Sequence, residues 1–371
     1  MKKPITVVGM DTSKSKIQPA LLLPDEARPT VWEIRNEPSA VRRLVRQVAR
    51  EAKGEVVFVY EAGPCGYALQ RQIEGLGHRC VVVAPSMVPV RPGERIKTNR
   101  RDARKLAEMY RAGILVEVRP PSPEEESVRD LCRAREDVLE DRLRCRHRLS
   151  KLLLRRGYVY TAGRHWTQGH LRWLRALRLG HEADGVVLAD YLLAVEQAEA
   201  RLKELDAQVQ LFAQKEPYRE RVGWLRCFRG IDTLTGMTVV VELHGIERFR
   251  SARELMAYVG LVPRESSTGD KHHRGPITGV GNSHVRRVLT EASHPYRHRP
   301  TVSGALAKRR QGQPGWVIAI ADKAQQRLHR RYWALAGRGL IKGKIIIALE
   351  RELVGFLWAV LTSPMAQTAA A

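Results

Sequence analysis

The chain has 371 residues, enough for two or three domains that each bury a core. It holds 64 Lys and Arg against 40 Asp and Glu, a formal net charge of +24. This balance indicates a polyanionic partner, nucleic acid above all, and no segment reaches the roughly 18 uncharged apolar residues of a membrane-spanning helix.

The cysteines and the N-terminus point to a reducing compartment. The five cysteines are scattered and include no Cys-x-x-Cys pair, which argues against a disulfide framework and a structural zinc site. Asp11 interrupts the first apolar run too early for a signal peptide. We therefore expect a cytoplasmic protein.

Residues 1–120 show the alternation of an α/β domain. Strands are predicted at 5–10, 17–23, 30–35, 55–60 and 79–83, and helices at 38–53, 66–75 and 99–112. The short polar turn at 12–14 makes the first two strands antiparallel neighbours. The run at 55–60 is almost wholly apolar, which is typical of a central strand buried on both faces.

Three carboxylates mark a candidate metal site in this domain. Asp11 ends the first strand, and Glu61 follows the central strand. Asp102 lies one turn into the helix at 99–112, with Asn99 three residues earlier on the same face. Because strand ends converge at one edge of an α/β sheet, these four oxygen donors could hold one or two Mg²⁺ ions. Taken singly, each acid could instead cap a turn, pair with an arginine or lie on a solvated face.

Cations surround Asp102. They could hold a polyanion against the acids, and the candidate nucleic-acid contacts here are Lys97, Arg100, Arg101, Arg104 and Lys105.

Three prolines then introduce a helical middle region, which we assign to residues 121–216. A long helix is predicted at 124–156, whose second half, 142–156, has seven Lys or Arg and no acid. Arg146 in this half is a further candidate nucleic-acid contact. A loop should follow, before a helix at 185–214.

The helix at 185–214 carries four heptads of apolar residues, a coiled-coil pattern. An antiparallel pairing with 124–156 and a pairing between protomers both satisfy it, and a plain amphipathic helix packed on its own domain is a close alternative. We expect a homo-oligomer, a dimer or a tetramer.

Residues 217–371 should form a mainly α domain. Helices are predicted at 252–258, 282–294, 316–335 and 343–361. Residues 222–245 read as helix, turn and helix. This is either a helix-hairpin-helix that presents N–H groups to a phosphate or an ordinary αα-hairpin.

Two serines in this domain are candidate nucleophiles. Ser266 and Ser267 are expected in a short polar loop before Gly269. The nearby cations, which could offset charge on a phosphate, are Lys271, Arg274, Arg286 and Arg287. A hydroxyl in such a loop could attack a phosphodiester, although a Ser/Thr turn before a surface helix is the simpler interpretation.

Motifs in both halves carry a family resemblance. Asp11, Glu61 in Tyr-Glu-Ala-Gly-Pro and Lys-Thr-Asn-Arg-Arg-Asp-Ala at 97–103 resemble the RuvC-like (RNase H fold) domain of DEDD-type insertion-sequence transposases, recombinases guided by a bridge RNA. The run 260–269, followed by Gly-Asn at 281–282 and His-Val-Arg-Arg at 284–287, resembles that family's transposase domain with its reactive serine.

The resemblance assigns roles to single residues. Asp11 and Glu61 match the first two acids and Asp102 the fourth, whereas the third falls on Asn99 and so loses a negative charge. The nucleophile falls on Ser267, with Ser266 as the near alternative. The implied fold is an RNase H-like domain, a coiled-coil middle and a mainly α transposase domain.

The resemblance also implies a bacterial, nucleoid-associated protein and an activity. Such a protein binds a non-coding guide RNA whose loops pair with target and donor DNA. Its serine forms a covalent phosphoserine link, and the acids with Mg²⁺ complete a composite site between protomers. Two alternatives stay open: a RuvC-like nuclease or resolvase that uses metal-activated water without a covalent intermediate, and a non-enzymatic RNA-binding scaffold with a degenerate acid site.

Overall fold

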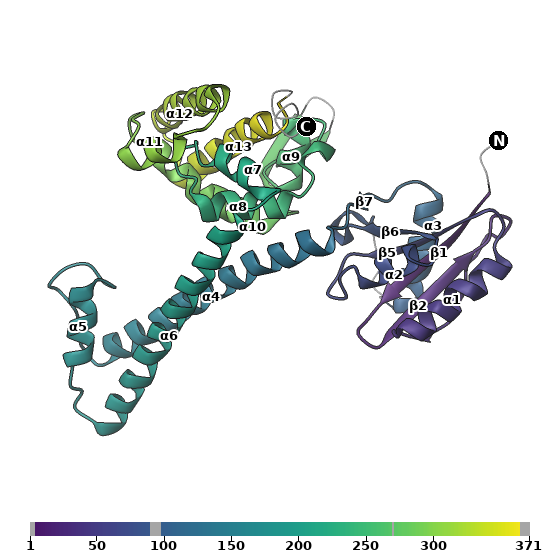
Figure 1. Cartoon of the computed structure of the whole chain (residues 1–371), viewed down its shortest axis with the longest axis horizontal. Coiled ribbons are helices and arrows are strands. Elements are labelled where there is room, and N and C mark those ends of the chain that lie inside the picture. The colour runs from purple at the N-terminus through teal and green to yellow at the C-terminus, as the bar shows by residue number, and fades with distance from the viewer. Residues whose placement is uncertain (1–3, 90–97, 269–270, 364–371) are drawn as a thin grey trace. The chain divides into compact units, whose positions relative to one another are not determined.

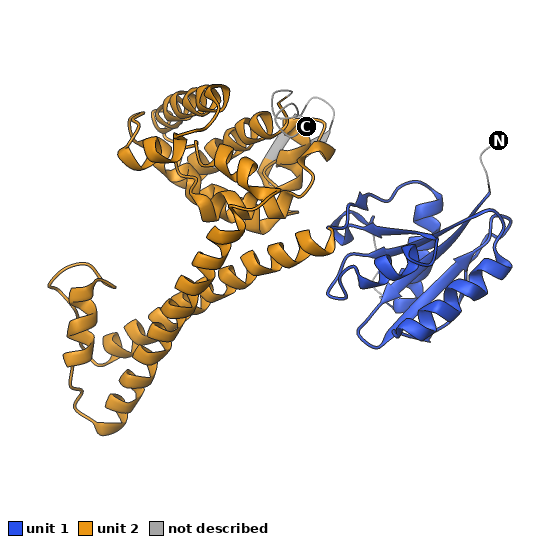
Figure 2. Cartoon of the chain, viewed as in Figure 1, with its two compact units in different colours: residues 1–121 blue, residues 122–371 orange. Residues whose placement is uncertain are grey.

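A computed structural model describes residues 4–89, 98–268 and 271–363; for residues 267–268 and 271–274 it describes the backbone only. The chain divides into two compact units, residues 1–121 and 122–371 (Figure 2), and each is described by itself. Within the described residues, no helix is both long and apolar enough to cross a membrane.

Unit 1 is built on a mixed sheet of seven strands (Figure 1). They are β1 (Ile5–Thr12), β2 (Lys16–Leu22), β3 (Thr30–Val31), β4 (Ile34–Arg35), β5 (Glu55–Glu61), β6 (Arg79–Val83) and β7 (Glu117–Val118). The order is β3-β2-β1-β5-β6-β7, and β4 also pairs with β2. Strand β1 is antiparallel to β2 and parallel to β5, as the short turn and the apolar central run predict.

The prediction of one continuous strand at 30–35 is wrong in one respect. The structure has two short strands there, β3 and β4, which both pair with β2. Between them Trp32 donates its N–H to the carbonyl of Pro19. Because Pro19 has no N–H to return, the ladder is interrupted at this point.

Helices cover both faces of the sheet. The apolar sides of α1 (Pro38–Glu51) and α2 (Ala68–Glu74) share a core with Met10 and Tyr60. On the other face, α3 (Asn99–Arg111) buries Ala103, Leu106 and Ala107 against Val7, Val57 and Val59. The predicted α/β domain is therefore confirmed.

Unit 2 begins with a helical arm (Figure 1). It consists of α4 (Pro123–Arg155), α5 (Gln168–Ala176) and α6 (Glu182–Phe212). Ion pairs join Arg135 to Asp206 and Arg156 to Asp184, so rising numbers on α4 meet falling numbers on α6. The two long helices are thus antiparallel partners within one chain, which was one of the pairings that the heptads allowed.

The loop predicted after α4 contains a helix that the sequence pattern did not reveal. The Thr167 hydroxyl accepts a hydrogen bond from the His170 N–H and begins α5. Leu171 and Leu174 of α5 then pack on Leu149 and Leu153 of α4. A helix of this length is stabilised by such packing more than by its own propensity, which is why a local pattern misses it.

The rest of unit 2 is mainly helical, as predicted. Its helices are α7 (Tyr218–Leu225), α8 (Thr233–Leu243), α9 (Ala252–Tyr258), α10 (Ser283–Ser293), α11 (Gly304–Arg310), α12 (Gly315–Ala336) and α13 (Lys342–Leu361), which enclose one large core. A two-stranded hairpin of β8 (Pro263–Thr268) and β9 (Lys271–Ile277) lies between α9 and α10 in the chain.

The turn between α7 and α8 faces inward. Gly230 has φ +83°, and a Cβ there would lie 2.3 Å from the carbonyl oxygen of Ala292 in α10. Ile231 is fully buried. A turn packed this closely favours the ordinary αα-hairpin over a phosphate-binding helix-hairpin-helix.

Candidate functional site

The strand register brings Asp11 and Glu61 to one place in unit 1. The last registered pair of the parallel strands β1 and β5 is Met10 with Tyr60, and the two acids come next on their strands. Side chains alternate along a strand, and Met10 and Tyr60 face α1 and α2. Asp11 and Glu61 therefore lie side by side on the opposite face, which α3 covers.

Helix α3 brings Asp102 to the same edge. The Arg111 guanidinium at its C-terminal end donates to the carbonyl of Glu26, in the loop that follows β2 at the amino edge of β1 (2.8 Å). Helix α3 therefore runs antiparallel to β1 and begins at the edge of the sheet where β1 ends. Its N-cap residue, Thr98, accepts a hydrogen bond there from the Arg101 N–H. Asp102 and Asn99 occupy this first turn.

The chemistry of these donors fits a hard divalent cation. Carboxylates from two strands and a helix, with the amide of Asn99, are the oxygen ligands that Mg²⁺ prefers. The buried Oε1 of Gln18 has no hydrogen-bond partner, and Gln18 lies opposite Asp11 in the β1–β2 register. Nowhere in the described residues, however, do three or more His, Cys, Asp or Glu side chains form a group that could hold a metal ion. The ligand set therefore stays a prediction.

Several predicted cations gather on α3. Arg101, Arg104 and Lys105 line a cavity of about 650 Å³ together with Glu108 and Ile114. Arg100 is exposed at the start of the helix. Lys97 lies outside the described residues. One turn of α3 thus carries both Asp102 and a cationic surface.

The candidate serines lie in a strand and not in a loop, which corrects the sequence prediction. Ser266 pairs with His273 and Ser267 with His272 across the hairpin of β8 and β9. The polar residues of this ribbon concealed its strand character, because both of its faces lack the apolar alternation of a packed sheet. The side chains of Ser267, Lys271 and Arg274 lie outside the described residues, whereas Ser266 is exposed.

The base of the hairpin is tightly bonded. Thr278 donates its N–H to the Val262 carbonyl and its hydroxyl to the Gly260 carbonyl. Gly260 has φ +77°, and a Cβ there would lie 2.2 Å from the carbonyl oxygen of Val280. The base of the hairpin, at the opposite end of β8 from the serines, is therefore held by backbone contacts that leave no room for a side chain at Gly260.

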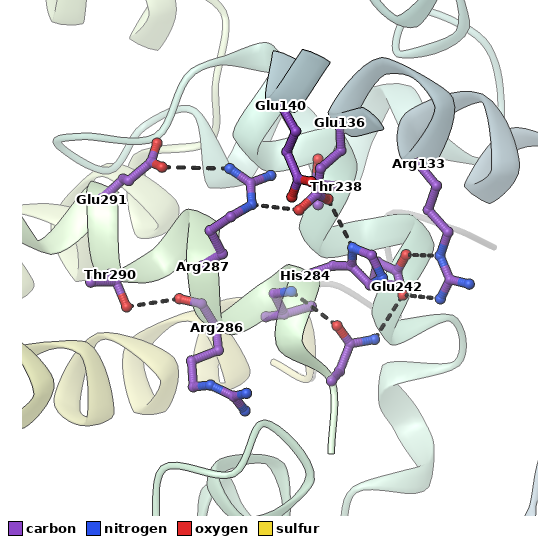
Figure 3. Close-up of polar contacts among 12 residues, drawn as sticks. Arg133, Glu136, Glu140, Thr238, Glu242, His284, Arg286, Arg287, Thr290 and Glu291 are labelled. Carbon is purple, nitrogen blue, oxygen red and sulfur yellow. Dashed lines mark hydrogen bonds and ion pairs between the residues drawn. The ribbon is translucent and has the colours of Figure 1, made fainter. Parts of the chain in front are cut away.

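A buried carboxylate links the hairpin to the arm (Figure 3). Glu242 of α8, 1% exposed, accepts two hydrogen bonds from the Arg133 guanidinium of α4, at 2.7 and 3.0 Å. It also accepts one from the side-chain amide of Asn282, which caps α10 directly after the hairpin (2.7 Å). The hydrogen bonds and charge of Arg133 and Asn282 lower the pKa of Glu242 despite its burial.

A second carboxylate joins the same elements (Figure 3). Glu136 of α4 lies 2.8 Å from Nδ1 of His284 and accepts a 2.5 Å hydrogen bond from Nε of Arg287. Although burial opposes it, these partners lower the pKa of Glu136 to about 2, and Glu136 raises the pKa of His284.

Three predicted nucleic-acid contacts are engaged inside the chain. Arg287 bonds Glu136, and Arg286 donates to the carbonyl of Val259 beside the hairpin (2.7 Å). Arg146 pairs with Glu199 and lies over the ring of Trp166. Their contacts position elements of the fold, which a run of basic residues in the sequence does not reveal.

Sequence patterns do not reveal the roles of Glu136 and Glu242. Their partners lie 40 to 151 residues away in the chain. No local pattern marks such a pair. The motif at 281–287 contains Asn282, His284 and Arg287, which are partners of these two carboxylates, but it does not indicate which carboxylates they bind.

Comparisons with known proteins agree with one another. Residues 224–304 match the model of the transposase IS116/IS110/IS902 family, and residues 8–156 match a DEDD transposase model. The chain is 38% identical to transposase y4qE of Sinorhizobium fredii, over 95% of the chain and 87% of that protein. It is 34% identical to the transposase for insertion sequence element IS1533 of Leptospira borgpetersenii, over 88% of the chain and 95% of that protein.

Proposed function

Because the chain belongs to the IS116/IS110/IS902 family of transposases, we propose that it is an RNA-guided DNA recombinase with a serine nucleophile. Membership of the family implies DNA cleavage and strand transfer. The guide RNA, the serine and a covalent intermediate belong to the proposal.

The placement of the acids supports the proposal most directly. Asp11 and Glu61 share one face at the carboxyl edge of adjacent parallel strands, and Asp102 begins the helix over that face. This edge is where ligands bind in sheets with parallel strands. The cationic surface of α3 beside Asp102 would hold a phosphodiester against the acids.

The proposed chemistry starts at Ser267. Its hydroxyl oxygen attacks the phosphorus of one strand and loses its proton, while the bond from phosphorus to the departing sugar oxygen breaks and that oxygen leaves as a hydroxyl. A hydroxyl of the partner strand then attacks the phosphoserine, which restores the serine and joins the strands. The number of phosphate ester bonds is the same before and after the two steps, so no external energy source is required.

A divalent cation, when bound, would stabilise the charge on the reacting phosphate. Asp11, Glu61, Asp102 and Asn99 are the residues proposed to hold it. Because Asn99 supplies an amide oxygen where the family pattern has an acid, this corner has less negative charge and should bind the ion less tightly. Asn99→Asp should lower the Mg²⁺ concentration needed for half-maximal cleavage.

The charge of the chain suits guidance by RNA. Base pairing supplies the sequence specificity, so the protein needs to hold backbones and helical shape. A net charge of +24 provides that attraction without base contacts. The composite site, with acids from one protomer and the serine from another, makes the proposed active form a homo-oligomer.

The test uses the full chain, the non-coding RNA of its own element and plasmids with donor and target sites. Ser267→Ala should abolish protein–DNA adducts trapped by denaturation, while binding of RNA and DNA persists. Ser266→Ala, the neighbouring change, separates the two candidate serines. Asp11→Ala should abolish cleavage without weakening RNA binding.

Two outcomes would oppose this mechanism. Adducts that persist in Ser267→Ala would remove the serine assignment. Cleavage retained in Ser267→Ala, with no adduct in the unmodified protein, would instead support a nuclease that uses water.

A further inference from the structure

The distal half of the helical arm has an unusual distribution of charge. Residues 142–181, called here the basic tip, contain eleven Lys and Arg and no Asp or Glu. They comprise the end of α4, all of α5 and the segments around it. The facing part of α6, residues 182–199, has five Asp and Glu and no Lys or Arg.

The acids of α6 neutralise only some of these cations. Asp184 pairs with Arg156, Glu196 with Arg175, and Glu199 with Arg146. A second group of exposed cations has no ion pair in the described part of the chain: Arg148, Lys151, Arg155, Arg164 and Arg172. The tip therefore presents net positive charge to solvent.

Three of these cations form a stripe. Arg148, Lys151 and Arg155 are spaced by three and four residues on α4, which puts them on one side of the helix. The stripe is about 10 Å long at 1.5 Å per residue. Because each strand of a duplex carries one phosphate per ~3.4 Å of helix axis, the stripe can meet more than one phosphate at once.

A groove adjoins the stripe between α4 and α6. Its volume is about 480 Å³, and Arg148 of α4 and Arg201 of α6 both line it. The small side chains of Ala194 and Ala198 leave it open. Three cations line the groove, and one of them, Arg144, pairs with Asp141 on the rim. The other two, Arg148 and Arg201, have no carboxylate partner among the described contacts.

The tip is held in shape before anything binds. Leu149, Leu153 and Leu174 share a small core. His170, 1% exposed, accepts a hydrogen bond from the Trp166 N–H at 3.0 Å and stacks on Trp173. Little ordering is needed on binding, which favours affinity.

We propose that the basic tip and its groove, on helices that carry none of the proposed catalytic residues, bind the phosphodiester backbone of nucleic acid. This rests on the proposed function only in requiring a nucleic-acid substrate. A second copy of the arm is the competing occupant, since Leu143 and Leu154 are exposed on the same helix. Like charges on two basic tips would oppose that contact.

The test compares two variants of the full chain. The tip variant is Arg148→Ala, Lys151→Ala and Arg155→Ala. The control variant is Arg42→Ala, Arg43→Ala and Arg46→Ala, which removes the same charge from exposed positions of α1. Fluorescence anisotropy measures binding of a random-sequence DNA duplex and of an RNA hairpin over a range of KCl concentrations.

The tip variant should reduce the magnitude of the slope of log affinity against log salt by roughly 2 to 3 with either probe. The control should change it less. A reduced slope with only one probe identifies whether DNA or RNA binds the tip. Slopes equal to those of the unmodified protein with both probes would overturn the proposal, as would unchanged binding together with an altered oligomeric state in sedimentation.

This binding test can succeed or fail independently of the proposed serine chemistry. Ser267→Ala should keep the slope of the unmodified protein, because the serine hairpin is not part of the tip. A tip variant that binds weakly but still forms adducts at saturating protein would locate the defect in binding.

Discussion

Gly9 determines how closely α3 approaches the sheet. A Cβ on Gly9 would lie 2.3 Å from the carbonyl oxygen of Ala103 and 2.6 Å from the backbone nitrogen of Ala107. Both are backbone atoms of a helix, so they cannot rotate away. The helix that carries Asp102 reaches its place over the acids only because this residue has no side chain.

We expect Gly9→Ala to lower the free energy of unfolding by about 1–3 kcal/mol through overpacking and to weaken cleavage by shifting α3. Urea denaturation measures the first effect. Gly185→Ala in α6 is the control, because a Cβ there meets nothing within 4 Å. It should be neutral or stabilising by up to about 1 kcal/mol. Equal stability of Gly9→Ala and the unmodified protein would contradict the close packing.

Glu350 is a fully buried carboxyl group in α13. Burial raises its pKa to about 7, and Thr290 lies within hydrogen-bond distance, at 2.7 Å. The Thr290 hydroxyl is also 3.0 Å from the carbonyl of Arg286. The Thr290 hydroxyl has one proton and can donate it to only one of these two oxygens. If it donates to the Arg286 carbonyl, its oxygen can accept a hydrogen bond from a protonated Glu350.

This predicts a dependence of stability on pH. The folded pKa of Glu350 lies above the ordinary 4.5, so its stabilising contribution is full below pH 4.5 and is lost as pH rises through about 7. Glu350→Gln should remove this loss and gain roughly 3 kcal/mol at pH 8 relative to the unmodified protein. Urea denaturation at pH 4.5 and pH 8 provides the measurement, and parallel curves for both proteins would contradict the assignment.

At the scale of elements, α4 and α10 are joined through Glu136 and its partners His284 and Arg287. The pKa of Glu136 is about 2, so its contribution is present above pH 4.5 and is lost as pH falls toward 2. The pKa of His284 is raised, so its contribution is present below pH 6.5 and is lost as pH rises through the folded value. The link is therefore strongest between about pH 4.5 and 6.5.

Glu136→Gln should cost roughly 1–3 kcal/mol in that window, because it removes the buried carboxylate that Arg287 and His284 share and leaves Arg287 only the exposed Glu291. The loss should shrink at higher pH, where His284 is neutral. Urea denaturation across pH supplies the test, and Glu140→Gln, an exposed acid of the same helix, is the matched control. A penalty independent of pH would show that His284 does not share the contact.

The hairpin of β8 and β9 shows how the elements cooperate. Its polar strands bury little, yet both ends are fixed by Gly260, Thr278 and the capping Asn282. Glu242 then connects Asn282 to Arg133 of the arm. These contacts attach the base of the hairpin to the core of unit 2 and to the arm.

At the scale of the whole molecule, the two units bury separate cores. We predict two calorimetric transitions. Gly9→Ala, in the core of unit 1, should lower the temperature of only one of them, whereas Glu136→Gln should affect the other. A single transition that both changes shift equally would show that the units unfold together.

The sequence by itself determined most of the elements. Short apolar runs placed β1, β5 and β6, and helical spacing placed α1, α3, α4 and α6, because strands buried on both faces are apolar throughout and helices bury one face at a regular spacing. The motifs also named Asp11, Glu61 and Asp102. In such elements the spacing of apolar residues can be recognised within one short segment of sequence.

Only the tertiary structure decided which of these residues meet. The register of β1 and β5 aligned Asp11 with Glu61, and the absence of a side chain at Gly9 let α3, the helix that carries Asp102, pack on the same face of the sheet. The fold also gives Arg146, Arg286 and Arg287 contacts inside the chain. These contacts join residues 27 to 151 positions apart, and a periodic pattern within one segment of sequence does not reveal which distant residues will meet.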